Sequence, residues 1–264
     1  MASDCAPWQA VGRSELGHER GKGERMIVDI GKGTIVCTVG GGGKTHLTYL
    51  LAEYAAQQGL RVVVTTTTKI QPPDRDSRLN NGRSIPAIFA SSPDELLSQH
   101  TIEPGSIIVL ATSYMNGGQR LVGVDPALPH ALITAGIADC VMVESDGARM
   151  LPLKAFGPAE PVIAQHATDI VTVAGLDALG AEISDSTVFR PELVRAIAGG
   201  PTLSRPAFER VVRALDEEAA RQVPTAKRHI LLNKADLCEE PCGLVRGAWI
   251  GALRRDGLRM TRDE

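Results

Sequence analysis

The stretch TVGGGGKTHL, residues 38–47, places four consecutive glycines directly before a lysine and a threonine. Glycine can adopt positive φ angles and approach a ligand closely, so successive N–H groups of such a loop can converge on a phosphate. The lysine can reach the β- and γ-phosphates, and the threonine hydroxyl can bind Mg²⁺. We therefore interpret six residues as a phosphate-binding loop: Gly40, Gly41, Gly42, Gly43, Lys44 and Thr45.

This loop departs from the usual pattern G-x-x-x-x-G-K-S/T, because Thr38 stands where the first glycine belongs. The turn can open at Gly40 instead, and Mur-type ligases resemble this arrangement, with threonine before a shortened glycine run. A glycine turn without a ligand is the alternative. A strand-like run precedes the loop and a helical pattern follows it, which favours a nucleotide site. We expect the Lys44 side chain to bind phosphate and to support no core.

A second motif, N-K-A-D, ends the apolar run of LLNKAD. In guanine-nucleotide proteins with this motif, the aspartate carboxylate, here Asp236, accepts hydrogen bonds from guanine N1–H and from the exocyclic amine. Adenine lacks that amine and has an acceptor at N1. The stem of Lys234 would pack along the base, and the amide of Asn233 would tie the pocket to neighbouring loops. The motif favours GTP and leaves ATP open.

A third group of polar residues follows the buried run VMVES. Carboxylates at the end of such a strand can hold Mg²⁺ or position a water molecule, and we predict Glu144, Asp146 and Arg149 as catalytic residues. We predict Thr45 and Asp146 as the magnesium ligands. Glu144 forms E-x-x-G with the glycine three residues on, a spacing that resembles the metallochaperone GTPases associated with urease, hydrogenase and cobalamin. An ordinary charge pair at a strand end is the alternative.

Threonines at the end of another strand-like run, in TTTTKI, leave two interpretations open. The carboxyl ends of strands form the edge where ligands bind in parallel sheets. Thr65 and Thr66 could therefore touch Mg²⁺ or the γ-phosphate. Equally, they could be ordinary strand residues.

Strand-like and helical patterns alternate along the chain, which predicts a doubly wound, mainly parallel α/β sheet flanked by helices, of the P-loop NTPase type. Apolar residues recur at helical spacing from Leu47 to Ala55, and Gly59 stands where a glycine can end that helix. Ser92 and Glu95 form a capping box. Asp125 and the following proline begin another predicted helix, and two more are predicted in RPELVRAIAG and RPAFERVVRALDEEAARQ. The predicted strands lie within 33–39, 61–68, 106–112, 139–145, 169–175 and 228–236.

Composition sets the broad class. The chain has 264 residues, 43% of them hydrophobic, and a net charge of −3, which gives no electrostatic footprint for nucleic acid. No apolar run is long enough to cross a bilayer, so we expect a cytoplasmic protein without a membrane partner. We expect residues 1–25 to be a disordered tail and 26–264 to be one nucleotide-binding domain.

The five cysteines give no strong signal. Cys37 and Cys140 lie in apolar runs and are expected to be buried thiols. Cys238 and Cys242 form C-x-x-x-C in a polar segment. Without a companion pair or a nearby histidine, we interpret them as loop residues, and a metal or redox role is the alternative.

The chain as a whole resembles the YqeC family. The segments that carry the resemblance are VGGGGKTHLTYLLAEYAAQQGLRVVVTTTTKI, VESDGARMLPLKAFGPAEPVI, VTVAGLDALG, FRPELV and LLNKAD. The resemblance implies a P-loop protein that acts in the maturation of selenium-dependent molybdenum hydroxylases, by supplying selenium to the molybdenum centre. Its partners would be a client hydroxylase or a cofactor-maturation protein, and many related folds form homodimers.

Two departures from the family stand out. His46 replaces a threonine that commonly follows Lys-Thr, and the segment after Asp236 is short. Three functions therefore stay open at this point: a GTP-driven maturation factor, an ATP-dependent ligase or kinase, and a non-catalytic nucleotide-binding scaffold. The expected cofactors are GTP (or ATP) and Mg²⁺.

Overall fold

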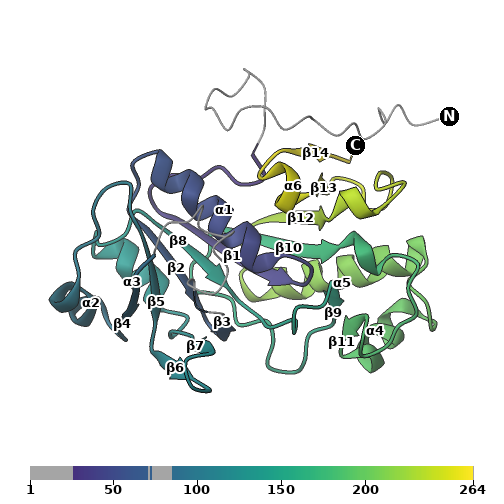
Figure 1. Cartoon of the computed structure of the whole chain (residues 1–264), viewed down its shortest axis with the longest axis horizontal. Helices are drawn as coiled ribbons and strands as arrows, with labels where there is room; N and C mark the ends of the chain where they lie inside the picture. The colour runs from purple at the N-terminus through teal and green to yellow at the C-terminus, as the bar shows by residue number, and fades with distance from the viewer. Residues whose placement is uncertain (1–25, 71, 73–84, 264) are drawn as a thin grey trace.

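The fold is built on a mainly parallel β-sheet (Figure 1). The structure is a computed structural model, and it describes residues 26–70, 72 and 85–263. Within that part of the chain the sheet has nine strands in the order β14-β13-β12-β10-β1-β8-β2-β5-β4. Neighbouring strands are parallel except at the edge, where β13 and β14 are antiparallel. The strands are β1 Thr34–Gly40, β2 Val62–Thr66, β4 Ala87–Phe89, β5 Ile107–Ala111, β8 Cys140–Glu144, β10 Asp169–Gly175, β12 Lys227–Asn233, β13 Trp249–Gly251 and β14 Met260–Arg262.

Helices cover both faces of this sheet. One face packs against α1, whose Leu47 and Leu51 join Val36 of β1 and Met142 of β8 in one apolar cluster. The other face packs against α3 and α5 in two further clusters. The helices are α1 Lys44–Gln57, α2 Pro93–Gln99, α3 Leu128–Thr134, α4 Pro191–Ala198, α5 Arg205–Gln222 and α6 Leu253–Asp256. This layering confirms the predicted doubly wound α/β class. None of the described helices combines the length and the apolar character that a membrane crossing requires.

The predicted helix ends are mostly confirmed. Helix α1 ends at Gln57, and Gly59 follows just after the cap residue with a φ of +79°, which few residues other than glycine adopt. At α2, the Ser92 hydroxyl accepts the Glu95 N–H at 3.1 Å, and the Glu95 carboxylate accepts the Ser91 N–H at 2.7 Å. The start predicted for α3 at Asp125 is wrong by a few residues. Its carboxylate accepts the N–H of Ala127 at 2.8 Å and forms a turn, and the helix begins only after that turn.

The strand register brings four chain segments to one edge of the sheet. Parallel pairing places Gly40 beside Val173, and Gly175 beside Asn233. Glu144 pairs with Thr38, two residues before the end of β1. Ligands of open parallel sheets bind at this carboxyl edge. The glycine loop, the acidic strand end and the N-K-A-D motif therefore lie along the same edge.

Short elements that the sequence does not predict complete the molecule. A three-stranded sheet consists of β3 Lys69–Ile70, β7 Arg120–Val122 and β6 Ser113–Met115. A parallel pair consists of β9 Leu153–Lys154 and β11 Val188–Phe189, and 3₁₀ turns η2 Leu176–Ala178 and η3 Ala235–Leu237 follow β10 and β12. The segment after Asp236 supplies β13, α6 and β14. The predicted tail, residues 1–25, lies outside the described residues.

Candidate nucleotide-binding site

The glycine loop connects the end of β1 to the first residue of α1. Gly40, Gly42 and Gly43 have φ angles of +94°, +76° and +134°, a region that side-chain-bearing residues rarely adopt. Close packing adds a second reason for glycine. A Cβ atom at Gly40 would lie 2.3 Å from the carbonyl oxygen of Val173, and one at Gly42 would lie 2.4 Å from the Gly175 nitrogen. The loop conformation therefore requires glycine whether or not a ligand is bound.

The N–H groups of the loop fall into two sets. Gly41 and Gly42 donate to the carbonyl oxygens of Val173 and Leu151, at 2.9 and 3.0 Å. In contrast, the N–H groups of Gly43, Lys44 and Thr45 have no acceptor among the residues that the structure describes. Gly43 is the N-cap of a 14-residue helix and the other two are its first residues, so all three lie at the end where the helix dipole is positive. This set is the one that can bind a phosphate.

Carboxylates of Glu144 and Asp146 lie against the lysine and threonine of the loop. The Lys44 Nζ atom is 3.8 Å from Glu144 Oε1 and 3.3 Å from Asp146 Oδ1, and it donates to the Gly40 carbonyl at 2.6 Å. The Thr45 hydroxyl donates to Glu144 Oε2 at 2.6 Å. Lys44 is only 4% exposed. The expectation that its side chain supports no core is therefore wrong, because it compensates two buried carboxylates.

The environment of Glu144 favours its protonated form. Burial raises the pKa of this carboxyl above its usual value, and the nearby Lys44 ammonium and Thr45 hydroxyl offset the effect of burial only in part. Carboxyls whose pKa is raised by burial are typical of groups that act as general acids or bases. The catalytic role of Glu144 stays a prediction, and the raised pKa is consistent with it.

A lysine that the sequence reasoning missed completes this cluster. Lys154 of β9 is entirely buried, and its Nζ atom lies 2.9 Å from Asp146 Oδ2. It also donates to Glu160 Oε2 at 2.5 Å, and Arg190 binds the same oxygen. Burial alone would raise the pKa of Glu160, but the hydrogen bonds from Arg190 and Lys154 outweigh it and lower that pKa. One signal was available, since Lys154 interrupts the apolar run LPLKAF.

Arg149, the third predicted catalytic residue, lies apart from the carboxylate pair in its contacts. It is exposed, its φ is +50°, and its guanidinium lies 4.7 Å from the centre of the Phe189 ring. Among the described residues, no hydrogen bond or ion pair joins it to Glu144 or Asp146. Its catalytic role stays a prediction.

The N-K-A-D motif begins at the last residue of β12, Asn233, which contacts the phosphate loop. The Asn233 side-chain amide nitrogen donates to the Gly42 carbonyl at 2.7 Å. Lys234 has a φ of +65°, and its Nζ atom lies 2.6 Å from Asp177 Oδ2. Asp236 lies in η3 and is exposed. The asparagine thus ties the predicted base loop to the phosphate loop, as the sequence indicated, and the aspartate is accessible to a ligand.

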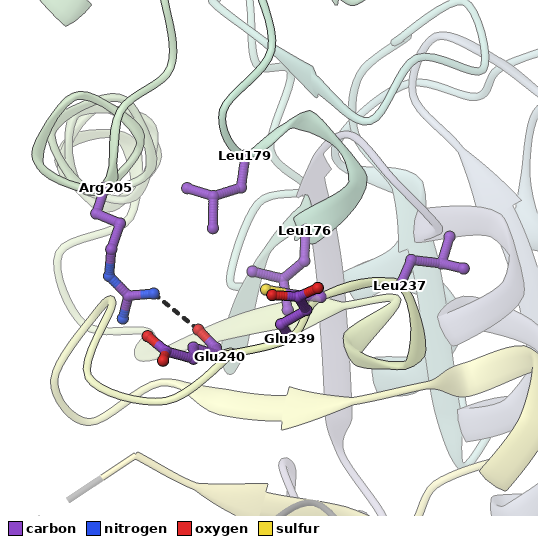
Figure 2. Close-up of a pocket in the computed structure, with 7 residues that line it drawn as sticks. Leu176, Leu179, Arg205, Leu237, Glu239 and Glu240 are labelled. Carbon is purple, nitrogen blue, oxygen red and sulfur yellow. Dashed lines mark hydrogen bonds between the residues drawn. The ribbon is translucent and has the colours of Figure 1, made fainter.

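A hollow of about 280 Å³ lies next to this motif. Figure 2 shows Leu176 and Leu179 on one side, the loop from Leu237 to Glu240 below them, and Arg205 at the far end. Arg205 donates to the carbonyl oxygen of Glu240 at 2.8 Å. Cys238 also lines this hollow. In the described part of the chain, no three His, Cys, Asp or Glu residues gather as a metal site, so the C-x-x-x-C pair has no third ligand of that kind there.

The two threonines of β2 are strand residues by their contacts. The hydroxyl of Thr65 donates to the Leu110 carbonyl and that of Thr66 to the Glu144 carbonyl, both at 2.7 Å. Both side chains are entirely buried. These bonds favour the interpretation of Thr65 and Thr66 as structural over the one in which they touch Mg²⁺.

A glycine loop between the first strand and the first helix of a parallel sheet, with carboxylates at the end of the adjacent strand, defines an α/β protein of the P-loop NTPase-like class. The model of the YqeC protein family matches residues 36–192, which is more than half of the chain. The chain therefore belongs to the YqeC family. The matched segment contains the phosphate loop and the acidic cluster, and it ends before the N-K-A-D motif.

One relative and one solved structure are similar to this chain. The chain is 29% identical over 221 residues to Uncharacterized protein YqeC of Escherichia coli (strain K12), covering 81% of this chain and 82% of that protein. It is also similar to a chain of the MinC:MinD cell division protein complex of Aquifex aeolicus. That likeness has a TM-score of 0.37 and 12% sequence identity, and covers 76% of this chain and 68% of the other.

Proposed function

We propose that this protein binds a magnesium nucleoside triphosphate, GTP in preference to ATP, at its phosphate loop. We further propose that its hydrolysis drives a step in the maturation of selenium-dependent molybdenum hydroxylases. The observation that carries the nucleotide site lies at the start of α1. There, N–H groups without an acceptor among the described residues converge with Lys44 and two carboxylates. A glycine turn with only a structural role would not need a buried lysine beside two buried carboxylates.

The oxygen atoms around the loop fit Mg²⁺, which prefers hard oxygen ligands. Asp146 is entirely buried, and its Oδ1 atom makes no hydrogen bond within the described structure. The Thr45 hydroxyl and Asp146 Oδ1 would hold the ion, and bound Mg²⁺ supplies neutralisation of the charge that develops on the phosphates. Lys44 would then turn its ammonium from the carboxylates to the β- and γ-phosphates. Glu144 would orient the attacking water and accept its proton.

Preference for guanine rests on the N-K-A-D loop. The bond from Asn233 to Gly42 fixes this loop against the phosphate site, and Asp236 is exposed three residues further on. An aspartate carboxylate can accept hydrogen bonds from both guanine N1–H and the exocyclic amine. Adenine has an acceptor at N1 and lacks that amine, so it cannot make these two bonds. These contacts support GTP as the nucleotide.

The role in hydroxylase maturation rests on the resemblance to the YqeC family. A nucleotide switch suits a protein that must bind a client, deliver a group and leave again, because the two nucleotide states can favour different partners. We propose that the triphosphate form docks on a molybdenum hydroxylase, or on a protein that matures its cofactor, and that hydrolysis gates selenium delivery there.

A nucleotide panel tests the first part of this proposal. Thermal unfolding is recorded with GTP, GDP, ATP and ADP, each with Mg²⁺ and with EDTA, and phosphate release is measured for both triphosphates. We expect the largest rise in Tm with GTP and Mg²⁺, because a ligand that binds only the folded state stabilises it. A preference for ATP would favour a ligase or kinase, and binding without phosphate release would favour a scaffold.

A further inference from the structure

Two lysines bind the two oxygen atoms of a single buried carboxylate. The Asp146 side chain is entirely buried, with Lys44 3.3 Å from Oδ1 and Lys154 2.9 Å from Oδ2. The Gly40 N–H also donates to Oδ2, at 3.1 Å. The two oxygens are therefore unequal. Oδ2 has a hydrogen-bond donor and an ammonium, whereas Oδ1 has, among the described residues, an ion pair with the lysine of the phosphate loop and no hydrogen bond.

Lys154 is itself held in place by a set of fixed contacts. Its ammonium donates to the Gly147 carbonyl at 2.6 Å and to Glu160 Oε2 at 2.5 Å, and Arg190 binds Glu160 from the other side. A buried ammonium without such partners would strongly destabilise the protein. Lysine with this full set of acceptors cannot move toward a ligand without breaking them, so its contact with Asp146 is a fixed part of the site.

We propose that Lys154 is a positioning residue that saturates Asp146 Oδ2 and so leaves Oδ1 as the oxygen that binds Mg²⁺. This inference rests on the proposed nucleotide site and adds the residue that prepares its metal ligand. Terminal carboxylate rotation is soft in an isolated side chain. Here Lys154 and the Gly40 N–H hold one oxygen, which fixes the direction of the other. When a phosphate takes over Lys44, Oδ1 loses its partner while Oδ2 keeps both of its own.

The test compares Lys154→Met with the wild-type protein. Methionine keeps most of the length of the lysine side chain and removes its charge. Calorimetry measures the binding of a non-hydrolysable GTP analogue at graded Mg²⁺ concentrations and in EDTA, and phosphate release from GTP gives kcat and KM. We expect the half-saturating Mg²⁺ concentration to rise and kcat to fall by about tenfold or more, as for lost partners of other metal-binding carboxylates. Two quantities are expected to stay within about twofold of their wild-type values, because Lys154 does not contact the nucleotide. They are the affinity for the analogue in EDTA and the KM for GTP at saturating Mg²⁺.

A matched control separates this effect from simple destabilisation. Arg61 forms an ion pair with Asp139, which precedes β8 at the end opposite to Glu144. Like Lys154→Met, Arg61→Met removes the cation of an ion pair, here a partly buried one. It is expected to leave the Mg²⁺ requirement and kcat unchanged. In an Asp146→Asn background, Lys154→Met is expected to add little, because a residue that acts only through Asp146 has no further effect once Asp146 is altered.

The outcomes separate this inference from the proposed function. If wild-type protein binds and hydrolyses the nucleotide but Lys154→Met has an unchanged Mg²⁺ requirement, the inference is wrong and the function stands. If wild-type protein binds no nucleotide, both fall together. Should Lys154→Met fail to fold, Glu160→Gln weakens the support of the same lysine, and an unchanged Mg²⁺ requirement in that variant overturns the inference equally.

Discussion

The side chain of Asn233 lies between the phosphate loop and the C-terminal helix α6, and it binds both. Its amide nitrogen donates to the Gly42 carbonyl at 2.7 Å, and its amide oxygen accepts the Leu253 N–H at 3.0 Å. Only 5% of Asn233 is exposed. One residue of the N-K-A-D motif thus joins three chain segments, the first and last of which, at Gly42 and Leu253, are 211 positions apart in sequence.

We predict that Asn233→Ala both destabilises the protein and weakens its binding of GTP. The substitution leaves the buried Gly42 carbonyl and the Leu253 N–H without partners, which costs about 1–3 kcal/mol for each such group. Urea unfolding and calorimetry with a non-hydrolysable GTP analogue measure the two effects. Asn233→Asp is the matched variant, because it keeps an acceptor for Leu253 and loses the donor to Gly42. Wild-type affinity in both variants would show that this link does not shape the site.

Lys44→Met is expected to abolish the nucleotide-induced rise in Tm. Methionine keeps the side-chain length but cannot make charge-assisted bonds to phosphate. The structure adds a cost to the apo protein, because Lys44 pairs with two buried carboxylates. Removing one partner of a buried pair can cost up to about 3–5 kcal/mol. Thermal melts with and without GTP and Mg²⁺ report both effects. If this variant keeps the full nucleotide response, the loop does not bind phosphate through Lys44.

Glu144→Gln is expected to change the pH dependence of stability in a defined direction. Burial raises the pKa of Glu144 in the folded protein above its unfolded value of about 4.3. Between these two values the folded state binds more protons than the unfolded state, so the wild-type stability falls as pH rises through that window. Glutamine cannot ionise, and it can still accept from Thr45. The variant should therefore gain stability relative to wild type at neutral pH, and the difference should shrink below about pH 4.3.

Urea unfolding of both proteins between pH 4 and pH 8 checks this expectation. Asp139→Asn is a control with the opposite sign, because the hydrogen bonds from Arg61 hold the pKa of Asp139 well below its usual range. The stabilisation from Asp139 is present above the unfolded pKa of about 3.9 and is lost as pH falls toward the folded value. Asp139→Asn should therefore destabilise the protein at neutral pH. A flat difference between wild type and Glu144→Gln across the range would contradict the raised pKa.

The central strands could be predicted because they are buried on both faces and read as continuous apolar runs. VVVTT of β2 and CVMVE of β8 are examples, and all five residues are buried in each. Strands β3, β9 and β11 are only two residues long, so no periodic pattern exists for them to show. The strand β13 has only three residues, and its place beside β12 is set by the pairing of the two strands in the folded sheet.

The candidate site was predictable where its residues are adjacent in sequence. Glycines 40–43 with Lys44 form such a local motif, and so does Glu144 with Asp146. Lys154 was missed because its place is set by partners that sequence spacing does not reveal. Lys154 and Arg190 both bind Glu160, although Arg190 is 36 positions further along the chain than Lys154. A buried charge of this kind depends on the assembled fold for its compensation.

The choice between GTP and ATP depends most on Asp236, which is exposed in η3. Asp236→Asn replaces one acceptor oxygen with an NH₂ donor, which would face the donors on the guanine edge. Such a mismatch costs about 1–3 kcal/mol, which is about a five- to more than hundredfold loss of GTP affinity. Xanthine has a carbonyl oxygen where guanine has its amine, so the new donor would find an acceptor there.

We therefore predict that Asp236→Asn weakens binding of GTP, leaves ATP near its already low affinity, and gains affinity for xanthosine triphosphate. Calorimetry with the three nucleotides and Mg²⁺ measures this exchange. Glu239→Gln, three residues further in the same exposed loop, is the matched control, and it removes a negative charge without touching the motif. If wild-type protein prefers ATP and Asp236→Asn changes nothing, N-K-A-D is an ordinary loop. An ATP-dependent ligase or kinase would then be the favoured function, because the phosphate loop itself does not distinguish the two bases.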